Sequence, residues 1–462
     1  MKLKINAPLD HGFMPMQVVL KEFEEKTAGY GKKIVIGIER DRGNVVTYEM
    51  SVYPDEAGHD DKNIAVVERV VKTMLWICGG YRIVIAGSDV IGNKIKESYS
   101  KGGAREFDRA FMARVYERDF EVEIVPMCRA PKQSESSESV GRHLKGCRIG
   151  FDAGDSDRKV SAVIDGKSVY SEEVVWYPKI NSDPSYHYEG IMEAMKTAAS
   201  HMPRVDSIGV STAGVCVDNK IMISSLFIKV SDEDFDKRVK HIYTDIAKKL
   251  GEEAGHEIPI KIANDGDVTA LAGAMSLEAG GVLGIAMGTS EAGGYVDMSG
   301  NITGRLNELA FVPVDFNKDA AVDEWSGDYG CGVKYFSQDA VIKLAPAAGI
   351  ELDESLSPAQ KLKVVQNKLE EGHEGARAIF ETIGVYFGCA VAYYANFYDI
   401  NHVLLLGRVS SGKGGDIILG SAKRLLECEY PKLAKKITVS LPDEKSRRVG
   451  QSVAAASLPE IS

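Results

Sequence analysis

The stretch CRIGFDAGDSDRKVSAVI, residues 147–164, decides the fold class of the chain. It begins with a short apolar strand, Cys147–Asp152, turns over Ala153–Lys159, and returns as the strand Val160–Ile164. The dipeptide Asp165-Gly166 that follows is a hairpin signal. The pattern therefore predicts a strand–turn–strand unit whose turn carries a strand-end acid and a glycine.

Downstream of this hairpin, helical patterns alternate with apolar strands. The apolar residues of Glu189–His201 recur at helical spacing and form one face. Further strands are predicted at Ser207–Ser211, Ile258–Ala263, Val282–Met287 and Val403–Leu406. This alternation is typical of an α/β architecture.

Upstream, the N-terminal region repeats the same order of elements. Strands at Ile34–Glu39 and Val45–Val52 precede a helix at Ala65–Cys78 and a strand at Arg82–Ala86. The turn between the first two strands, residues 40–43, lacks the glycine spacing of a phosphate loop. We interpret the region as a degenerate half-repeat that does no chemistry and serves packing, capping or oligomerisation; a generic β-β-α-β resemblance is the alternative.

Composition narrows the class of protein. The 462 residues carry a formal net charge of -11, which disfavours binding to a phosphate backbone, so nucleic acid is not expected as a partner. No apolar run approaches the roughly 20 residues that a membrane span needs, and the first residues lack the apolar core of a secretory signal. The seven cysteines include no CxxC pair. We predict a cytoplasmic protein with free thiols and no membrane partner.

The domain boundaries follow from a polar, Ser-rich linker at 129–145. We expect a non-catalytic half-repeat over 1–140, an N-terminal lobe over 146–270 and a C-terminal lobe over 271–462. Whether the last helix packs back on the N-terminal lobe is left open.

The loop after the first strand is a candidate phosphate loop. Gly154 lets the backbone approach an anion, and Ser156 can hold phosphate oxygens. Asp152 can hold Mg²⁺ through water, because Mg²⁺ keeps its hydration shell. The loop acids Asp155 and Asp157 are awkward beside phosphate unless a metal ion or Lys159 offsets them. A plain hairpin is the alternative.

A second glycine turn, GIAMGTSEAGG, spans residues 284–294. Gly288, Thr289 and Ser290 form a candidate second phosphate cradle, and a glycine hairpin is the alternative. Glu291 is expected at the tip, where its charge would repel phosphate.

A third motif, Asn264-Asp265-Gly266-Asp267, lies between a strand and a helix predicted at 268–275. Asp265 at the strand end can accept the proton of a substrate hydroxyl, which is what phosphoryl transfer asks of a carboxylate. The alternative is that Asp265 or Asp267 only caps the helix.

A fourth motif, LLGRVSSGKGGD, spans residues 405–416. A strand runs into a turn of small residues, including Gly407, Ser410 and Gly412, and a helix is predicted to begin near Asp416. Such a turn can lie flat against an adenine–ribose unit. A plain connection between a strand and a helix is the alternative.

The order of the four motifs resembles the actin-like ATPase superfamily. In detail, residues 147–462 resemble the ROK family of bacterial sugar kinases and related repressors. The resemblance extends to STAG at 211–214, GRLNEL at 304–309 and GCGVKYFS at 330–337. It implies two actin-like lobes of the ribonuclease-H type, and a hexokinase- or glucokinase-like transferase that uses ATP and Mg²⁺ on a sugar or polyol. A homodimer is left open.

By this resemblance Asp265 is the catalytic base and Asp152 the acid on the metal side. The same resemblance makes Asn264 and Glu308 sugar ligands, and Ser211 and Thr212 part of the turn that lines the sugar.

The sequence departs from the family at the zinc site and at one sugar ligand. The family's zinc site uses a histidine and three cysteines; Phe311 stands in place of the histidine and only Cys331 remains, so no structural zinc is expected. Val333 replaces a glutamate that touches the sugar. We therefore expect a less polar pocket that prefers a substrate with fewer hydroxyls or an apolar substituent.

The sequence leaves two alternative functions open. One is a non-catalytic sugar or nucleotide sensor or regulator on the same fold, although residues 1–128 do not read as a helix-turn-helix. The other is an ATPase activator with a cysteine-bound iron–sulfur cluster, for which an isolated Cys331 gives little support.

Overall fold

A computed structural model describes residues 3–135, 140–442 and 450–461; the predicted linker at 129–145 includes residues outside this description. The chain is a mixed α/β protein, as predicted from the alternation of elements. It separates into two compact units. Unit 1 comprises Met1–Ser136, Ile285–Gly293 and Arg305–Leu441, and unit 2 comprises Ser137–Gly284, Gly294–Gly304 and Pro442–Ser462. Each is described by itself.

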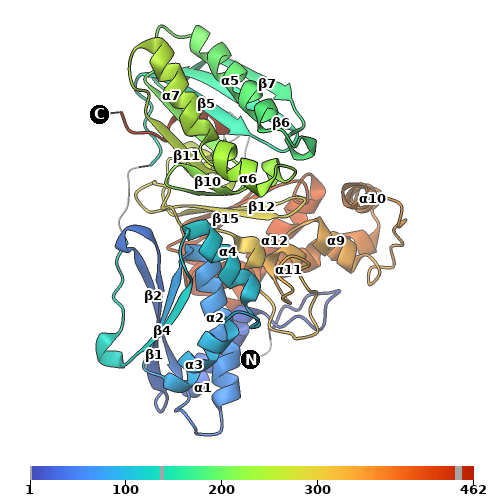
Figure 1. The fold of residues 1–462 in the computed structure, drawn as a ribbon. Coiled ribbons are helices and arrows are strands. Elements are labelled where there is room, and N and C mark those ends of the chain that lie inside the picture. Colours follow the sequence, from blue (N-terminus) through green and yellow to red (C-terminus); the bar gives the residue numbers. More distant parts are fainter. Residues whose placement is uncertain (1–2, 136–139, 443–449, 462) are drawn as a thin grey trace. The chain divides into compact units, whose positions relative to one another are not determined.

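Unit 2 is built on a five-stranded sheet (Figure 1). The central strand β5 pairs antiparallel with β6 and parallel with β8, and β11 pairs parallel with β8. The order across the sheet is β11 (Ile260–Asn264), β8 (Ser207–Thr212), β5 (Cys147–Ala153), β6 (Asp157–Ile164) and β7 (Lys167–Val175). Because β5, β8 and β11 run parallel, their carboxyl ends, which carry the predicted acids, meet at one edge of the sheet.

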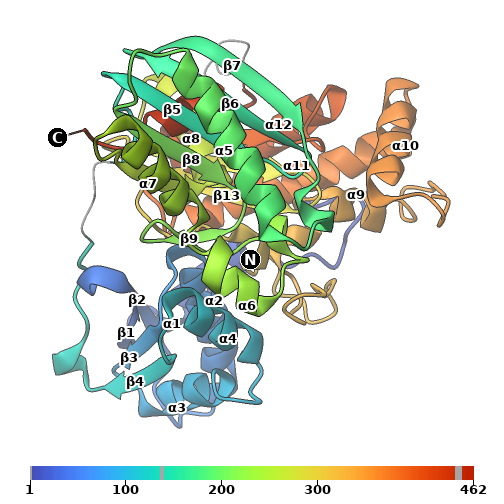
Figure 2. The ribbon, with the colours of Figure 1, turned by 45° about the horizontal axis from the view of Figure 1, so that its top comes forward.

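Helices cover both faces of this sheet. The views in Figures 1 and 2 agree that α5 (Pro184–Ser200) and α7 (Ile242–Ala254) lie on the same face, where their apolar residues form one core with Ile149 and Phe151. On the other face lies α14 (Gln451–Ala456), so close that a Cβ on Gly150 or Gly209 would be 1.7 Å from a backbone oxygen of α14. The helix α8 (Asp265–Leu277) follows β11 directly. A short hairpin of β9 (Val215–Val217) and β10 (Lys220–Ile223) and the helix α6 (Asp232–Asp234) complete the unit.

The first part of unit 1 is a four-stranded sheet in the order β2-β1-β3-β4. Its strands are β1 (Lys32–Glu39), β2 (Val45–Val52), β3 (Arg82–Ala86) and β4 (Glu121–Val125), and its helices are α1 (Met16–Thr27), α2 (Asp60–Cys78), α3 (Asp89–Ser98) and α4 (Glu106–Tyr116). The predicted β-β-α-β order is therefore present. The turn between β1 and β2 is a single helical turn at Asp41–Gly43 in which Arg42 has a φ of 59°.

The second part of unit 1 contains most of another four-stranded sheet, in the order β13-β12-β14-β15. Its strands are β12 (Val282–Met287), β13 (Glu291–Val296), β14 (His402–Leu406) and β15 (Thr438–Ser440), and the boundary between the units falls inside β12 and β13. The helices are α9 (Gln338–Leu344), α10 (Pro358–Glu370), α11 (Glu374–Tyr394), α12 (Lys413–Glu429) and α13 (Pro431–Lys436).

Several element bounds differ from the sequence prediction, and three of the differences have a clear local reason. The turn after β5 is only residues 154–156, because Ala153 already pairs with Arg158. The helix predicted from Glu189 begins at Pro184, because Asp183 caps it by accepting from the backbone N–H of Ser185 at 2.9 Å. The helix predicted near Asp416 begins at Lys413, directly after a glycine of positive φ.

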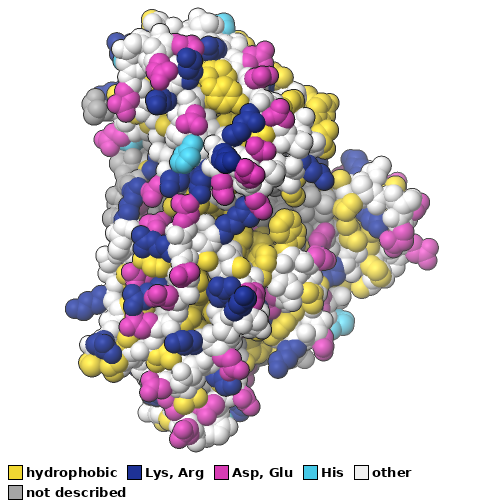
Figure 3. All heavy atoms as spheres, viewed as in Figure 1, with side chains coloured by type: hydrophobic (Ala, Val, Ile, Leu, Met, Phe, Trp, Pro, Cys, Tyr) yellow, Lys and Arg dark blue, Asp and Glu magenta, His cyan; other side chains and the backbone are white. Residues whose placement is uncertain are grey.

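Two surface properties bear on function. On the face shown in Figure 3, basic and acidic side chains are interspersed and no continuous basic area is seen. Among the described residues, each helix is too short or too polar to cross a membrane. All seven cysteines lie in the described residues, and none forms a disulfide.

Candidate functional site

The acid at the end of β5 is held by a serine on the neighbouring strand. Asp152 lies opposite Ser211 of β8, whose hydroxyl donates a 2.7 Å hydrogen bond to the Asp152 carboxylate. Both side chains are buried. Burial raises the pKa of Asp152 to about 6; the Ser211 hydrogen bond opposes this rise and the charge of Asp265 adds to it. Asp152 and Asp265 are therefore close enough to interact electrostatically.

Asp265 is the first residue of α8, and the cap of that helix is Asn264. The interpretation of Asp265 or Asp267 as the cap is thus wrong, because the Asn264 side chain accepts the backbone N–H of Gly266 at 2.7 Å. The same N–H lies 2.9 Å from the Asp265 carboxylate. Burial raises the pKa of Asp265, an effect that the Gly266 N–H opposes. A carboxyl with a raised pKa is better suited to take a proton near neutral pH.

Gln451 joins the two acids, and the sequence interpretation missed it. Its side-chain amide donates to the Ser211 hydroxyl at 3.0 Å and to the backbone oxygen of Asp265 at 3.1 Å. Gln451 begins α14, far along the chain from both partners. No motif in its neighbourhood signals this role; only the packing of α14 on the sheet reveals it.

The predicted sugar ligands of unit 2 make internal hydrogen bonds. The Asn264 amide donates to the backbone oxygen of Gly214 at 2.8 Å, which ties the small-residue turn to the start of α8. Thr212 is fully buried and its hydroxyl accepts from Tyr243 at 3.1 Å. Ser211 is fully buried too. Ser211 and Thr212 therefore support the surrounding groups, and a direct contact with substrate stays a prediction.

The first candidate phosphate loop has its acids offset by lysines. Lys179 lies 2.6 Å from Asp155, and Lys159 lies 3.2 Å from Asp157. Ser156 is exposed at the tip, and its hydroxyl donates to Asp157 at 3.2 Å. The backbone N–H of Gly154 donates to the Asp157 oxygen at 3.0 Å, which closes the turn tightly. The two ion pairs reduce the repulsion that these acids would exert on phosphate.

The second glycine turn, in unit 1, exposes two hydroxyl residues. Thr289 and Ser290 are exposed at its tip, and the Gly288 N–H donates to the Ser290 oxygen at 2.9 Å. From α9, the Gln338 N–H donates to the Gly288 oxygen at 2.9 Å. The turn is thus fixed at its base and open at its tip.

The fourth motif lies beside this turn within unit 1. Gly407 has a φ of 95° and packs on Met287, where a Cβ would be 2.3 Å from the Met287 oxygen. The Val409 N–H donates to that same oxygen at 3.0 Å. Ser410 is buried, and Gly412 at the start of α12 has open space where a side chain would stand. Gly412 is thus a place where a planar group can approach the backbone.

Glu308 is positioned by the N-terminal region. The backbone N–H groups of Leu306, Asn307 and Glu308 donate to the last carbonyl oxygens of α2, at 3.4, 3.0 and 3.1 Å. A helix leaves its final carbonyls without partners, so a segment that supplies donors there is fixed in place. The N-terminal region therefore holds the segment that carries a predicted substrate ligand.

Glu291 is not at the exposed tip where it was expected. It is the first residue of β13 and its side chain is buried in unit 1, with one carboxylate oxygen against Gly332. Within the described residues neither oxygen has a hydrogen-bond partner. Burial, and secondarily the charge of Glu308, raise the pKa of Glu291 well above its usual value. Its charge therefore does not lie on the phosphate loop itself.

Phe311 and Cys331, the two positions at which the resemblance predicted that zinc is lost, are surrounded by aromatic rings and by charged side chains, respectively. Phe311 packs against Trp76 of α2 with ring centroids 4.2 Å apart. Cys331 is buried near Lys72 and Asp328. Across the described ranges, no three His, Cys, Asp or Glu side chains form a metal-binding group.

Together, unit 2 carries two interacting acids and a strand-end loop, and unit 1 carries a hydroxyl-bearing turn, an adjoining glycine turn and a carboxylate pair. These are groups that can hold a hydrated cation, bind anionic oxygens and accept a proton.

Comparison with known proteins gives a fold-level result. No protein-family model and no curated protein sequence matches the chain. Among solved structures, a ROK hexokinase from Thermus thermophilus matches with a TM-score of 0.51 and 17% identity, over 67% of this chain and 97% of that one. A ROK-family transcriptional regulator, a homolog of the E. coli MLC protein, matches with a TM-score of 0.50 and 17% identity, over 68% and 79%.

Proposed function

Because the chain has the actin-like fold of the ROK family, as the sequence motifs predicted, we propose that it is an ATP-dependent kinase for a sugar or polyol hydroxyl. The observation that supports this best is the acid pair of unit 2. Ser211 donates to the Asp152 carboxylate, and Gln451 donates to the Ser211 hydroxyl and to the backbone oxygen of Asp265, so hydrogen bonds connect the two residues. Burial and, to a smaller extent, the charge of Asp265 raise the pKa of Asp152. Two acids in distinct surroundings suit two distinct tasks in phosphoryl transfer.

Asp265 is the proposed base. Its raised pKa brings it closer to neutrality, where a carboxylate accepts the proton of an attacking hydroxyl most effectively. The N–H of Gly266 holds the carboxylate in one orientation. A fixed orientation matters because the attacking oxygen must be aligned with the phosphorus.

Asp152 fits a hydrated Mg²⁺. Among the described residues its buried carboxylate accepts one side-chain hydrogen bond, from the Ser211 hydroxyl, so it has acceptor capacity left for metal-bound water. The proposed ATP contacts are Gly154, Ser156 and Lys159 in unit 2 and Gly288, Thr289 and Ser290 in unit 1, where the hydroxyls of Ser156, Thr289 and Ser290 are exposed at the loop tips. Gly407, Ser410 and Gly412 form the turn proposed to face the adenosine, with open space at Gly412. When bound, ATP supplies the phosphoryl group.

Glu308 and Asn264 are the proposed sugar ligands, with Ser211 and Thr212 supporting them from the sheet. Glu308 is half-buried and has a fixed backbone. With Phe311 and Val333 at two polar positions of the family, we propose a preference for deoxy or N-acyl sugars. The free thiols agree with a proposed cytoplasmic location.

The test is a phosphorylation assay on glucose, deoxy sugars, N-acyl sugars and polyols with Mg-ATP, with mass spectrometry of the product. The change Asp265→Asn is expected to lower turnover by at least about a thousandfold while Mg-ADP affinity changes less than about threefold. Asp319→Asn, at an exposed acid, is the matched control and keeps full activity. A variant Asp265→Asn with wild-type turnover would rule out the base.

A regulator on the same fold is the second candidate, supported by the match to a ROK-family transcriptional regulator. It predicts that sugars bind, seen as a rise in the melting temperature, while no member of the panel is phosphorylated.

A further inference from the structure

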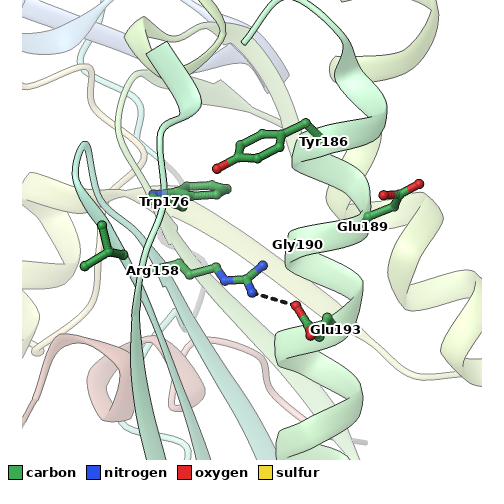
Figure 4. A pocket seen from close by; sticks show the side chains of 7 residues that line it. Arg158, Trp176, Tyr186, Glu189, Gly190 and Glu193 are labelled. Carbon is green, nitrogen blue, oxygen red and sulfur yellow. Dashed lines mark hydrogen bonds and ion pairs between the residues drawn. The ribbon is translucent and has the colours of Figure 1, made fainter. Parts of the chain in front are cut away.

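A pocket of about 490 Å³ lies on unit 2. It is formed by the start of β6, the end of β7 and the first turns of α5. This volume is in the range that small-molecule sites occupy. Its lining residues are Arg158, Val175, Trp176, Tyr186, Glu189, Gly190 and Glu193 (Figure 4). None of them is among the residues proposed to bind ATP, Mg²⁺ or sugar.

A single guanidinium supplies the cationic group of this pocket. Arg158 is buried, with 8% of its surface exposed, and its Nη2 donates to Glu193 at 2.8 Å. Its Nε has no hydrogen-bond partner within the described residues. The Glu193 side chain is 73% exposed, so this carboxylate lies at the pocket mouth, where water weakens the ion pair. A buried guanidinium with unused donor capacity is a site for an oxyanion.

The position of the guanidinium is built into the fold. Its Nη1 lies against Gly190 on α5, where a Cβ would be only 2.3 Å away. Any other residue at 190 would push the guanidinium out of its place. In Figure 4 the side chain of Arg158 reaches toward α5 beneath Trp176, and the Glu189 carboxylate points away from it.

The walls are aromatic and apolar. Trp176 is buried and Tyr186 faces it across the pocket, as Figure 4 shows. The Tyr186 hydroxyl accepts the backbone N–H of Tyr177 at 2.9 Å, which fixes the ring. Next to these walls, Val175 and Tyr177 are 66% and 62% exposed. A ligand that fits must therefore combine a negatively charged group with an apolar or ring-shaped body.

The same wall is joined to the loop after β5. The Trp176 indole N–H donates to the Gly154 oxygen at 2.8 Å, and its backbone N–H donates to the Ser156 oxygen at 3.2 Å. Lys179, three residues further on, pairs with Asp155. All three loop residues are thus tied to the segment that forms the pocket wall.

We propose that this pocket binds a small organic anion, a carboxylate or phosphate monoester on a ring-shaped body, and that the bound anion steadies the loop Gly154–Ser156 through Trp176. The Arg158 guanidinium binds the anion in place of Glu193, and the body packs between Trp176 and Tyr186.

The binding test uses calorimetry on the full chain with phenyl phosphate, benzoate, phenol and inorganic phosphate. Phenyl phosphate or benzoate is expected to bind, at least about tenfold more tightly than phenol and inorganic phosphate, since both the charge and the ring contribute. The better of the two identifies the anion. Arg158→Met is expected to weaken binding at least about tenfold. Arg204→Met, at an exposed arginine of the same unit, changes it less than about twofold.

The loop is followed by hydrogen exchange of the peptide that covers residues 150–160. The better anion is expected to slow exchange there at least about threefold in the wild type. Trp176→Phe keeps an aromatic wall but lacks the indole N–H that donates to Gly154, so it is expected to keep binding and to reduce the slowing. Arg158→Met loses both. Binding that is undiminished in Arg158→Met, an absence of binding by either aromatic anion, or unchanged exchange in the wild type would overturn the proposal. None of these readouts depends on ATP, so they are independent of the proposed kinase activity.

Discussion

The backbone N–H of Glu308 donates a 3.1 Å hydrogen bond to the carbonyl oxygen of Trp76, near the end of α2. Trp76 belongs to the N-terminal region, and Glu308 to the segment GRLNEL at 304–309. The N-terminal region therefore does more than cover a surface, because it fixes the backbone of a proposed substrate ligand.

Asp328 is expected to contribute strongly to the stability of this part of unit 1. It accepts from Arg69 and Lys72 of α2, at 2.7 Å each, and pairs with Arg105 at 2.9 Å. The change Asp328→Asn leaves these buried cations poorly compensated, and we expect a loss of about 3–5 kcal/mol of stability. Thermal unfolding followed by circular dichroism measures it, with the exposed Asp319→Asn as control. A melting temperature equal to that of the control would show that the cluster contributes nothing.

The same cluster predicts a loss of stability in acid. Burial opposes ionisation, but the neighbouring cations hold the pKa of Asp328 well below its usual value. A carboxyl with a lowered folded-state pKa stabilises the fold above its unfolded pKa, near 4, and this contribution disappears as the pH falls below that value. The difference in melting temperature between wild type and Asp328→Asn should therefore be largest above pH 5 and shrink toward pH 3.

Replacement of Glu291 is expected to stabilise the protein. Its carboxyl is buried and has no hydrogen-bond partner in the part of the chain that the structure describes, and burial raises its pKa well above the usual value. We expect Glu291→Met to gain about 2 kcal/mol at pH 7. Glu427→Met, at an exposed helical position, should change stability by less than about 0.5 kcal/mol.

The stability that Glu291→Met gains over the wild type should increase with pH. A carboxyl whose pKa is higher in the folded than in the unfolded state does not change the free energy of unfolding below its unfolded-state pKa, near 4.3. As the pH rises above that value, the carboxyl lowers the free energy of unfolding. The advantage of Glu291→Met should therefore grow between pH 4 and pH 7. A variant that is less stable than wild type at pH 7 would mean that Glu291 has an essential partner.

Mg²⁺ binding is expected to follow the ionisation of Asp152. With its pKa at about 6, this carboxyl is mostly protonated below that pH, so Mg²⁺ affinity should fall about tenfold per pH unit there. Ser211→Ala removes the hydrogen bond that lowers this pKa, and should move the midpoint upward by about one pH unit. Mg²⁺ titrations between pH 5 and 8 measure the midpoint. Ser200→Ala, at an exposed serine, should leave it unchanged.

The sheet of unit 2 is expected to tolerate no side chain at Gly209. A Cβ there would be 1.7 Å from the backbone oxygen of Ala455, so Gly209→Ala must displace α14 and cost about 3 kcal/mol or more. Gly420→Ala is the matched control, because Gly420 lies inside α12 with open space around it. That change should instead stabilise by about 0.5–1 kcal/mol. Equal melting temperatures for the two variants would contradict the close packing of α14.

Much of the fold was predictable because its signals are local. The strands Val45–Val52, Arg82–Ala86 and Val282–Met287 have the predicted bounds, since apolar runs between turn residues mark them clearly. The start of α8 was misplaced by three residues. Asn264, rather than an aspartate, caps that helix, and a sequence in which three of four consecutive residues can cap does not say which one does.

The α/β class, the order of the four motifs and the resemblance to the ROK family could all be read from the amino-acid sequence, because each motif depends on residues a few positions apart. The folded structure was needed to show that Gln451 contacts Ser211 and the Asp265 backbone, that α2 holds Glu308, and that Glu291 is buried away from the loop tip. Such contacts join residues distant along the chain. They depend on how helices pack on sheets, which the local secondary-structure propensities of the residues do not predict.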